Sequence, residues 1–123
     1  MKPTGPIPPG WEALDGVLSV AGIRLTEVAA QAEETPLFVY SRALLTRKFE
    51  QLRAAMPERL AIHYAMKANP FGPLLQHMNS LVDGFDIASG GELELALAAG
   101  VDPARISFAG PGKRNRELEA AIR

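Results

Sequence analysis

One lysine of the sequence stands where its chemistry could be used. The stretch "HYAMKANPFG" (63–72) places Lys67 at the end of an apolar run and just before a turn, in a chain with four lysines. Lysine is strongly hydrated and prefers surfaces, so a lysine that closes a buried strand needs a reason. A lysine in a low-dielectric pocket loses its proton more easily, and its amine can form an imine with an aldehyde. The plainer reading is a strand-end lysine whose side chain reaches into solvent.

A carboxylate lies in the corresponding place of the next predicted strand. Asp86 sits inside the apolar run "GFDIAS" (84–89). A carboxylate in such a run is costly unless it has a cation to meet. Since Lys67 and Asp86 belong to successive strands, we expect the two side chains to lie near each other.

Other kinds of reactive site find little support. The chain has no cysteine, which excludes disulfides, thiolate nucleophiles and cysteine-bound metals within it. His63 and His77 have no acidic partner at ligand spacing, so no metal site is expected. The stretch "AGPGKR" (109–114) fails the phosphate-loop pattern, because Arg114 stands where serine or threonine is required. It is interpreted as a turn between a strand and a helix.

Composition indicates a soluble globular domain. Of the 123 residues, 47% are hydrophobic and 22% are charged, and the formal net charge is −1. This balance does not favour nucleic acid or an anionic membrane as a partner. No stretch approaches the roughly 18–20 apolar residues of a membrane span, and the start is not a secretory signal. We expect a cytoplasmic location, which the absence of cysteine fits.

The elements that must hold these residues alternate along the chain. A strand is predicted over 35–41 and a helix over 41–56, with Ser41 as its N-cap. From residue 59 onward strands and helices alternate, and Tyr64, Phe85 and Ser107 mark three successive strands about 22 residues apart. This rhythm is typical of a parallel sheet, in which the active site lies at the carboxyl ends of the strands. Two and a half such units are visible, so either part of a larger barrel or a small open sheet is possible.

Three motifs in the same order and spacing resemble one known family. "YAMKANP", "GFDIASGGELELALAAGV" and "RISFAGPGK" are similar to the pyridoxal-phosphate-dependent decarboxylases of the alanine-racemase fold, which include the diaminopimelate and ornithine decarboxylases. The resemblance covers 35–123 and includes "TPLFVY". When the opening residues are considered together with these motifs, the chain is most similar to the subgroup associated with exosortase systems. It implies an α/β fold, the N-terminal part of a (β/α)8 TIM barrel.

The proline-rich start and the resemblance together predict a domain organisation. Residues 1–15 are expected to form a flexible proline-rich arm, and 16–40 a leading strand and helix that would join a C-terminal β-domain. Residues 41–123 would supply the first βα units of an incomplete barrel that binds pyridoxal phosphate. The sequence stops within a predicted helix, so we expect a truncated chain, inactive on its own.

The resemblance assigns roles to five residues. Lys67 matches the catalytic lysine that forms the internal aldimine with pyridoxal 5'-phosphate. Asp86 matches an aspartate beside the cofactor, and Ala65 and Tyr64 match the wall of the cofactor pocket. Glu92, in "GGELELA", matches an acid that can meet the lysine once substrate has displaced it.

The implied activity is the decarboxylation of an amino acid, similar to that of diaminopimelate decarboxylase, with a small-molecule substrate and a homodimer as the working form. The alternatives are an amino-acid racemase of the same fold, a non-catalytic decarboxylase homologue that regulates a partner, and an unrelated βα domain with a structural lysine. Racemases usually continue after the lysine with a tyrosine-glycine-histidine-glycine stretch, whereas this chain reads "NPFGP". The sequence leaves the identity of the amino acid open.

Overall fold

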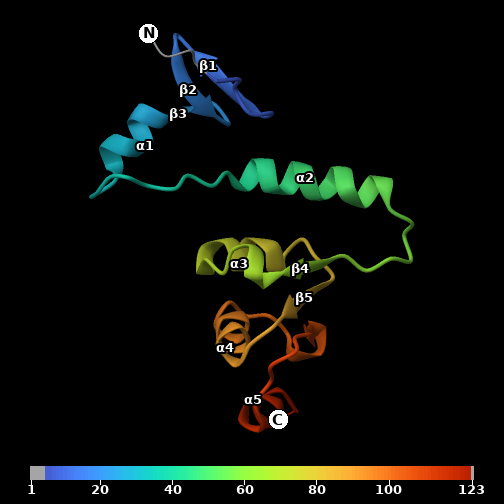
Figure 1. Cartoon of the computed structure of the whole chain (residues 1–123). Helices are drawn as coiled ribbons and strands as arrows, with labels where there is room; N and C mark the ends of the chain where they lie inside the picture. The colour runs from blue at the N-terminus through green and yellow to red at the C-terminus, as the bar shows by residue number, and fades with distance from the viewer. Residues whose placement is uncertain (1–4, 123) are drawn as a thin grey trace. The chain divides into compact units, whose positions relative to one another are not determined.

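The computed structural model describes residues 5–122, and the chain divides into two compact units, Met1–Lys48 and Phe49–Arg123. The first unit contains a small antiparallel sheet, and the second contains a parallel sheet with its helices (Figure 1). Within the described residues, no helix has both the length and the apolar character that crossing a membrane requires.

Two tight turns shape the sheet of the first unit. Strands β1 (Trp11–Leu14), β2 (Val17–Val20) and β3 (Ile23–Arg24) pair antiparallel in the order β1-β2-β3. Asp15-Gly16 joins the first pair and Ala21-Gly22 the second, and all four residues have positive φ. Two-residue turns of this kind match the twist of the strands that they connect.

The first unit differs from the sequence prediction in two places. Trp11–Leu14 lies in a strand, although the sequence assigned 1–15 to a flexible arm. The predicted strand over 35–41 is wrong in the described structure, where this segment is irregular and pairs with no strand. A strand needs a hydrogen-bonding neighbour, and β-propensity alone does not supply one.

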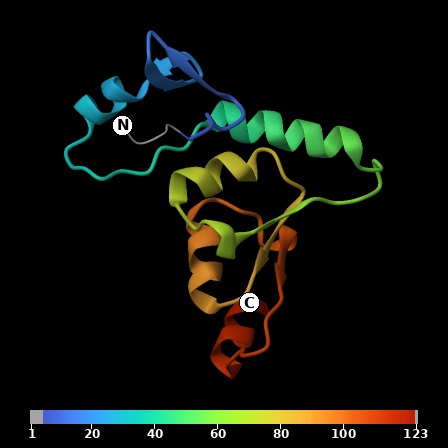
Figure 2. The ribbon, with the colours of Figure 1, turned by 45° about the horizontal axis from the view of Figure 1, so that its top comes forward.

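Two helices follow the small sheet. Helix α1 (Leu25–Gln31) is short, and α2 (Arg42–Ala55) is one continuous helix, drawn in green in Figure 2. The predicted cap of α2 is confirmed, because the amide of Leu44 donates to Ser41 Oγ at 3.3 Å. The boundary between the compact units falls after Lys48, inside α2.

The second unit alternates strands and helices, as the sequence predicted. Its parallel sheet has the order β4-β5-β6, and register pairs Tyr64 with Phe85 and Ala65 with Asp86. The elements in chain order are β4 (His63–Ala65), η1 (Met66–Ala68), α3 (Gly72–Asn79), β5 (Gly84–Ile87), α4 (Gly90–Ala98), η2 (Pro103–Arg105), β6 (Ile106–Phe108) and α5 (Asn115–Ile122).

One face of this sheet packs against helices. Helices α3 and α4 lie on the same side of β4 and β5 in Figure 1. Phe85 and Ile87 of β5 are fully buried, as are Met66 and Leu75. Residues that alternate along a strand point to opposite faces, so the neighbours of Phe85 and Ile87 belong to the other face. The core therefore fixes which side chains remain available for a site.

An ion pair ties the start of β5 to residues earlier in the chain. The Asp83 carboxylate accepts the amide proton of Ile62 at 2.6 Å and pairs with Arg53. The Ile62 hydrogen bond and then the Arg53 guanidinium hold the pKa of Asp83 below its usual value. These contacts lie at the amino ends of the strands, away from the end where a site is expected.

Candidate active site

The face of the parallel sheet opposite the buried core carries small and polar side chains. Register places Ala65, Asp86 and Ser107 side by side on three neighbouring strands. Lys67 follows Ala65 by two residues, at the carboxyl end of β4. The prediction that Lys67 lies near Asp86 depends on this register and on the contact between η1, which contains Lys67, and β5.

Lys67 is exposed, and its neighbour in sequence is buried. It is the central residue of η1, which is one turn of 3₁₀ helix, and the preceding residue, Met66, has no exposed surface. Met66 therefore anchors the turn in the core, and the lysine side chain is left outside it. An exposed amine on a fixed backbone can reach a ligand without carrying its charge into the core.

Asp86 has a hydrogen-bond partner from the adjacent strand. The Ser107 hydroxyl lies 2.8 Å from Asp86 Oδ1 and 3.3 Å from the carbonyl oxygen of Phe85. Asp86 is half-buried, so this partner offsets part of the cost of removing a carboxylate from water. The contact also fixes the direction in which the Asp86 carboxylate points.

Tyr64 lies on the core side of the sheet, unlike its neighbour Ala65. Its ring meets that of Phe85 edge-on, with the ring centroids 5.8 Å apart and an interplanar angle of 71°. Its hydroxyl donates to the carbonyl oxygen of Asn69 at 3.0 Å. This placement gives Tyr64 contacts to the core and to the turn after Lys67, and so does not favour the predicted role as a wall of a cofactor pocket.

Glu92 makes two hydrogen bonds at the start of α4, and the second goes to Ala88, one residue before the N-cap Ser89 whose amide a capping box would use. Its amide donates to Ser89 Oγ at 3.2 Å, and its carboxylate accepts the amide proton of Ala88 at 2.6 Å. Ala88 and Ser89 directly follow β5, so Glu92 shapes the turn at the carboxyl end of that strand. A contact of Glu92 with Lys67 stays a prediction.

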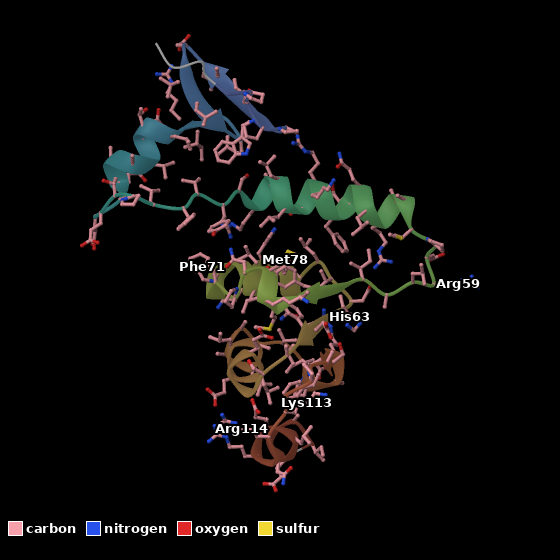
Figure 3. The ribbon with its side chains drawn as sticks, in the orientation of Figure 1. Arg59, His63, Phe71, Met78, Lys113 and Arg114 are labelled. Carbon is pink, nitrogen blue, oxygen red and sulfur yellow. The ribbon has the colours of Figure 1, made fainter. Side chains whose placement is uncertain are left out.

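A second carboxylate connects the turn before α4 to the turn before α5. Glu117 accepts the amide proton of Arg114 through one oxygen and that of Gly90 through the other, each at 2.8 Å. The hydrogen bond from Arg114 and then that from Gly90 hold the pKa of Glu117 below its usual value. In Figure 3, Lys113 and Arg114 mark the turn that leads into α5.

The two histidines do not form a metal site with other residues. Among residues 5–122, no group of three histidine, cysteine, aspartate or glutamate residues could hold a metal ion. The His63 ring lies against the α-carbon of Gly84, where an added Cβ would come within 2.7 Å of it. His63 is thus placed beside β5 by close packing.

Sequence reasoning missed three residues that shape the site. Ser107 was used only to mark a strand, although Asp86 and Ser107 are paired by register. The side chains of Asn69 and Glu117 accept hydrogen bonds from backbone amides, and residue types alone do not reveal such partners. One signal was present for Glu117: it stands three residues after Arg114 at a predicted helix start, where a glutamate can close back onto the first amide.

Comparison with known proteins identifies the family of this chain. Residues 42–123 match the family model described as the pyridoxal binding domain of pyridoxal-dependent decarboxylases. A diaminopimelate decarboxylase of Aquifex aeolicus is 47% identical over 115 residues, which are 93% of this chain and 27% of that protein. One of Neisseria meningitidis is 47% identical over 94 residues, which are 76% of this chain and 23% of that protein.

Solved structures share the fold. A structure from Aquifex aeolicus has a TM-score of 0.83 and 43% identity, covering 94% of this chain and 29% of that one. The diaminopimelate decarboxylase of M. jannaschii in co-complex with L-lysine has a TM-score of 0.82 and 28% identity, covering 93% and 28%. The chain thus spans about a quarter of the length of the relatives it matches. Its α/β fold is that of the beginning of an alanine-racemase-like barrel, and the chain belongs to the family of pyridoxal-dependent decarboxylases.

Proposed function

We propose that the full-length protein containing these residues decarboxylates an amino acid with pyridoxal phosphate as cofactor, in the manner of diaminopimelate decarboxylase. The observation that carries the proposal is the exposed Lys67 in the turn directly after β4, the strand that pairs with β5 and places Ala65 beside Asp86. The curated relatives in the comparison are named diaminopimelate decarboxylases. Because the chain spans a quarter of their length, the activity of the whole protein is a proposal.

The residues present fit the cofactor. Pyridoxal phosphate needs a primary amine for covalent attachment, and Lys67 offers one outside the core. Ala65 leaves space on the sheet face, since its side chain is a single methyl group. Asp86 adds negative charge to that face, and Ser107 fixes its direction. When bound, the cofactor supplies the electron-accepting ring system on which amino-acid decarboxylation depends.

Each of these residues then has a task at a stated atom. Lys67 Nζ would hold the cofactor covalently, and the same amine, when it is not so bound, could carry a proton. The Asp86 carboxylate favours a positively charged group on the open face of the sheet. Glu92 is proposed to receive the unbound Lys67 amine, in addition to accepting the amide proton of Ala88. The phosphate and ring-nitrogen contacts are expected from other parts of the protein.

The proposed substrate is diaminopimelate, which loses one carboxyl group as carbon dioxide to leave lysine. The support is the names of the curated relatives, together with two structural neighbours, from Helicobacter pylori and M. jannaschii, whose structures were solved with L-lysine. An ornithine decarboxylase is also among the neighbours, at 25% identity. Ornithine is therefore the first competing substrate to test. The narrower resemblance to the exosortase-associated subgroup stays a prediction.

The assembly and location of the protein are also proposals. The leading segment 16–40 is expected to join a β-domain formed by later residues, and a homodimer is expected to complete the site. A cytoplasmic location suits an enzyme that acts on a free amino acid. Neither nucleic acid nor a membrane is proposed as a partner, in keeping with the net charge of −1.

Borohydride reduction tests the proposal. The full-length protein is mixed with pyridoxal phosphate and reduced, and the labelled peptide is mapped. We expect the label on Lys67, its loss in Lys67→Arg, and its retention in the control Lys48→Arg, which changes an exposed lysine of α2. Carbon dioxide release is then measured with diaminopimelate and with ornithine.

The outcomes separate the candidate functions. A label on Lys67 with carbon dioxide release supports a decarboxylase, and a label with loss of optical activity but no carbon dioxide would indicate a racemase. A folded full-length protein that takes no label at Lys67 would contradict the enzyme proposal and favour a non-catalytic homologue.

A further inference from the structure

The turn that carries Lys67 is closed by hydrogen bonds on both sides of the lysine. Tyr64, three residues before it, donates its hydroxyl proton to the carbonyl oxygen of Asn69, two residues after it, over 3.0 Å. The Asn69 side chain in turn accepts the amide proton of Phe71 at 3.0 Å. Figure 3 shows Phe71 at the start of α3, at the opposite end from Met78. Asn69 therefore links β4 to the beginning of α3.

The donor in this arrangement is fixed by the core. The Tyr64 ring packs edge-on against Phe85, which has no exposed surface, and the two residues are paired across β4 and β5. Edge-to-face packing in a core restricts ring orientation. The position of the Tyr64 hydroxyl is thus set by the sheet and its core, and that of Asn69 is set by the hydroxyl.

We propose that Tyr64 is a positioning residue: its hydroxyl, through the Asn69 carbonyl, holds the turn 67–69 in the one conformation that presents the Lys67 amine on the open face of the sheet. The inference rests on the proposed attachment of pyridoxal phosphate to Lys67. It gives Tyr64 a different task from the pocket wall expected from sequence, because Tyr64 acts from the core side and through the backbone. Nothing in this role requires Tyr64 to touch the cofactor.

The proposal makes Tyr64→Phe the informative variant. Phenylalanine keeps the ring that packs on Phe85 and removes only the hydroxyl, so the fold should remain. Without the hydrogen bond to Asn69 the turn samples other conformations, and a covalent bond that needs one conformation forms less readily. Loss of one such hydrogen bond corresponds to a change of about five- to tenfold in an equilibrium constant.

Two measurements on the full-length protein avoid relying on turnover. The first is the pyridoxal phosphate concentration that half-labels Lys67 after borohydride reduction, expected to rise about five- to tenfold in Tyr64→Phe. The second is hydrogen–deuterium exchange, without cofactor, of a peptide covering 66–72, expected to be faster in the variant by a similar factor. Tyr40→Phe is the matched control, since Tyr40 is the other tyrosine of the chain, and it should change neither quantity. Melting temperature and circular dichroism report on the fold.

A second variant tests the other hydrogen bond of this turn, between the Asn69 side chain and the Phe71 amide. Asn69→Ala removes the acceptor for the Phe71 amide, and it should raise the half-labelling concentration and the exchange rate in the same direction as Tyr64→Phe. This variant keeps the inference testable if Tyr64→Phe proves unstable.

Each outcome has a defined meaning. Wild-type protein without a label at Lys67 would defeat the proposed function and this inference together. A wild-type label with Tyr64→Phe unchanged in both measurements would overturn the inference and leave the function standing. If Tyr64→Phe unfolds globally, Asn69→Ala decides: unchanged values in that variant would overturn the inference, because the Asn69 link would then not hold the turn, and raised values would support it. Raised values in both variants, with the fold retained, would establish it.

Discussion

The carboxylate of Glu117 accepts a hydrogen bond from the amide of Gly90 at 2.8 Å, across 27 residues of sequence. Its other oxygen caps α5 through the amide of Arg114. One side chain thus joins the turns that follow β5 and β6, and both turns lie at the carboxyl ends of the strands. The arrangement holds two neighbouring turns of the candidate site in a fixed relation.

The lowered pKa of Glu117 predicts a pH-dependent contribution to stability. Because the carboxylate is stabilised in the folded state, its contribution is present above the unfolded value near 4.5 and is lost as the pH falls through the lower folded value. Glu117→Gln can satisfy only one of the two amides with its single carbonyl oxygen. We expect a lower urea midpoint than wild type at neutral pH, and a difference that narrows below pH 4.5.

The matched control for this prediction is Glu119→Gln, an exposed position on the same helix. It removes the same charge from α5 without touching either amide, so its urea midpoint should follow that of wild type. An equal loss in both variants would mean that net charge, and not the bridge between the two turns, sets the effect.

Substitutions of Asp86 and of Ser107 are expected to change activity to different extents. Asp86→Asn keeps an oxygen for the Ser107 hydroxyl but removes the negative charge from the open face. We expect kcat/KM to fall at least tenfold, about 1.4 kcal/mol, with little change in melting temperature. Ser107→Ala keeps the charge and loses only its orientation, so its kcat/KM should fall less. Wild-type kcat/KM in Asp86→Asn would show that the charge does not serve the reaction.

Much of the second unit could be predicted from sequence because its pattern is strong. Apolar strands alternate with helices, and this rhythm is what a parallel sheet requires. The two signals that placed the site, Lys67 after β4 and Asp86 within β5, follow from the same rhythm. The alternation of apolar strands with helices was therefore enough to predict the parallel sheet and to select Lys67 and Asp86 as candidate site residues.

Side-chain direction was harder to predict. Tyr64 and Ala65 were assigned to one wall, yet neighbouring strand residues point to opposite faces. The strand spacing was taken as about 22 residues, whereas register pairs Phe85 with Ile106 and Asp86 with Ser107, a spacing of 21. A shift of one residue exchanges the two faces of a strand. For this reason the partner of Asp86 was not found from sequence.

Gly84 illustrates a packing constraint that sequence does not reveal. An added Cβ would lie 2.7 Å from the Arg105 carbonyl oxygen and 2.7 Å from the His63 ring. Gly84→Ala should therefore destabilise the protein by about 1–3 kcal/mol, as overpacking does. Chemical denaturation of the full-length protein measures the change.

The comparison variant is Gly91→Ala, in the first turn of α4. Its added Cβ would be 4.0 Å from Ser89 Oγ, an ordinary contact. Alanine is a better helix former than glycine by about 0.5–1 kcal/mol in a helix interior. We expect Gly91→Ala to be neutral or stabilising. If Gly84→Ala were equally neutral, the close approach of β5 to its neighbours would not be rigid.

Of the small sheet, the sequence predicted a leading strand within 16–40, where β2 lies, but missed β1, because prolines and glycines dominate the first ten residues and 1–15 was assigned to an arm. An aspartate-glycine pair between apolar residues is a strong hairpin signal, and Asp15-Gly16 fills that place. The second turn, Ala21-Gly22, gives no such signal. Alanine is disfavoured at positive φ, and here its φ is 51°. The structure reveals this turn through the pairing of β2 with β3, in which Val20 lies opposite Ile23.

The strained alanine gives the last prediction. A left-handed conformation costs an L-residue roughly 1–2 kcal/mol, and glycine or asparagine adopts it at lower cost. Ala21→Gly and Ala21→Asn should therefore slow hydrogen–deuterium exchange of the amides in 11–24 by severalfold. Ala13→Gly, in the middle of β1, should do the opposite, because there glycine only adds backbone freedom. Faster exchange in both Ala21 variants would mean that the alanine side chain stabilises the turn by more than its conformation costs.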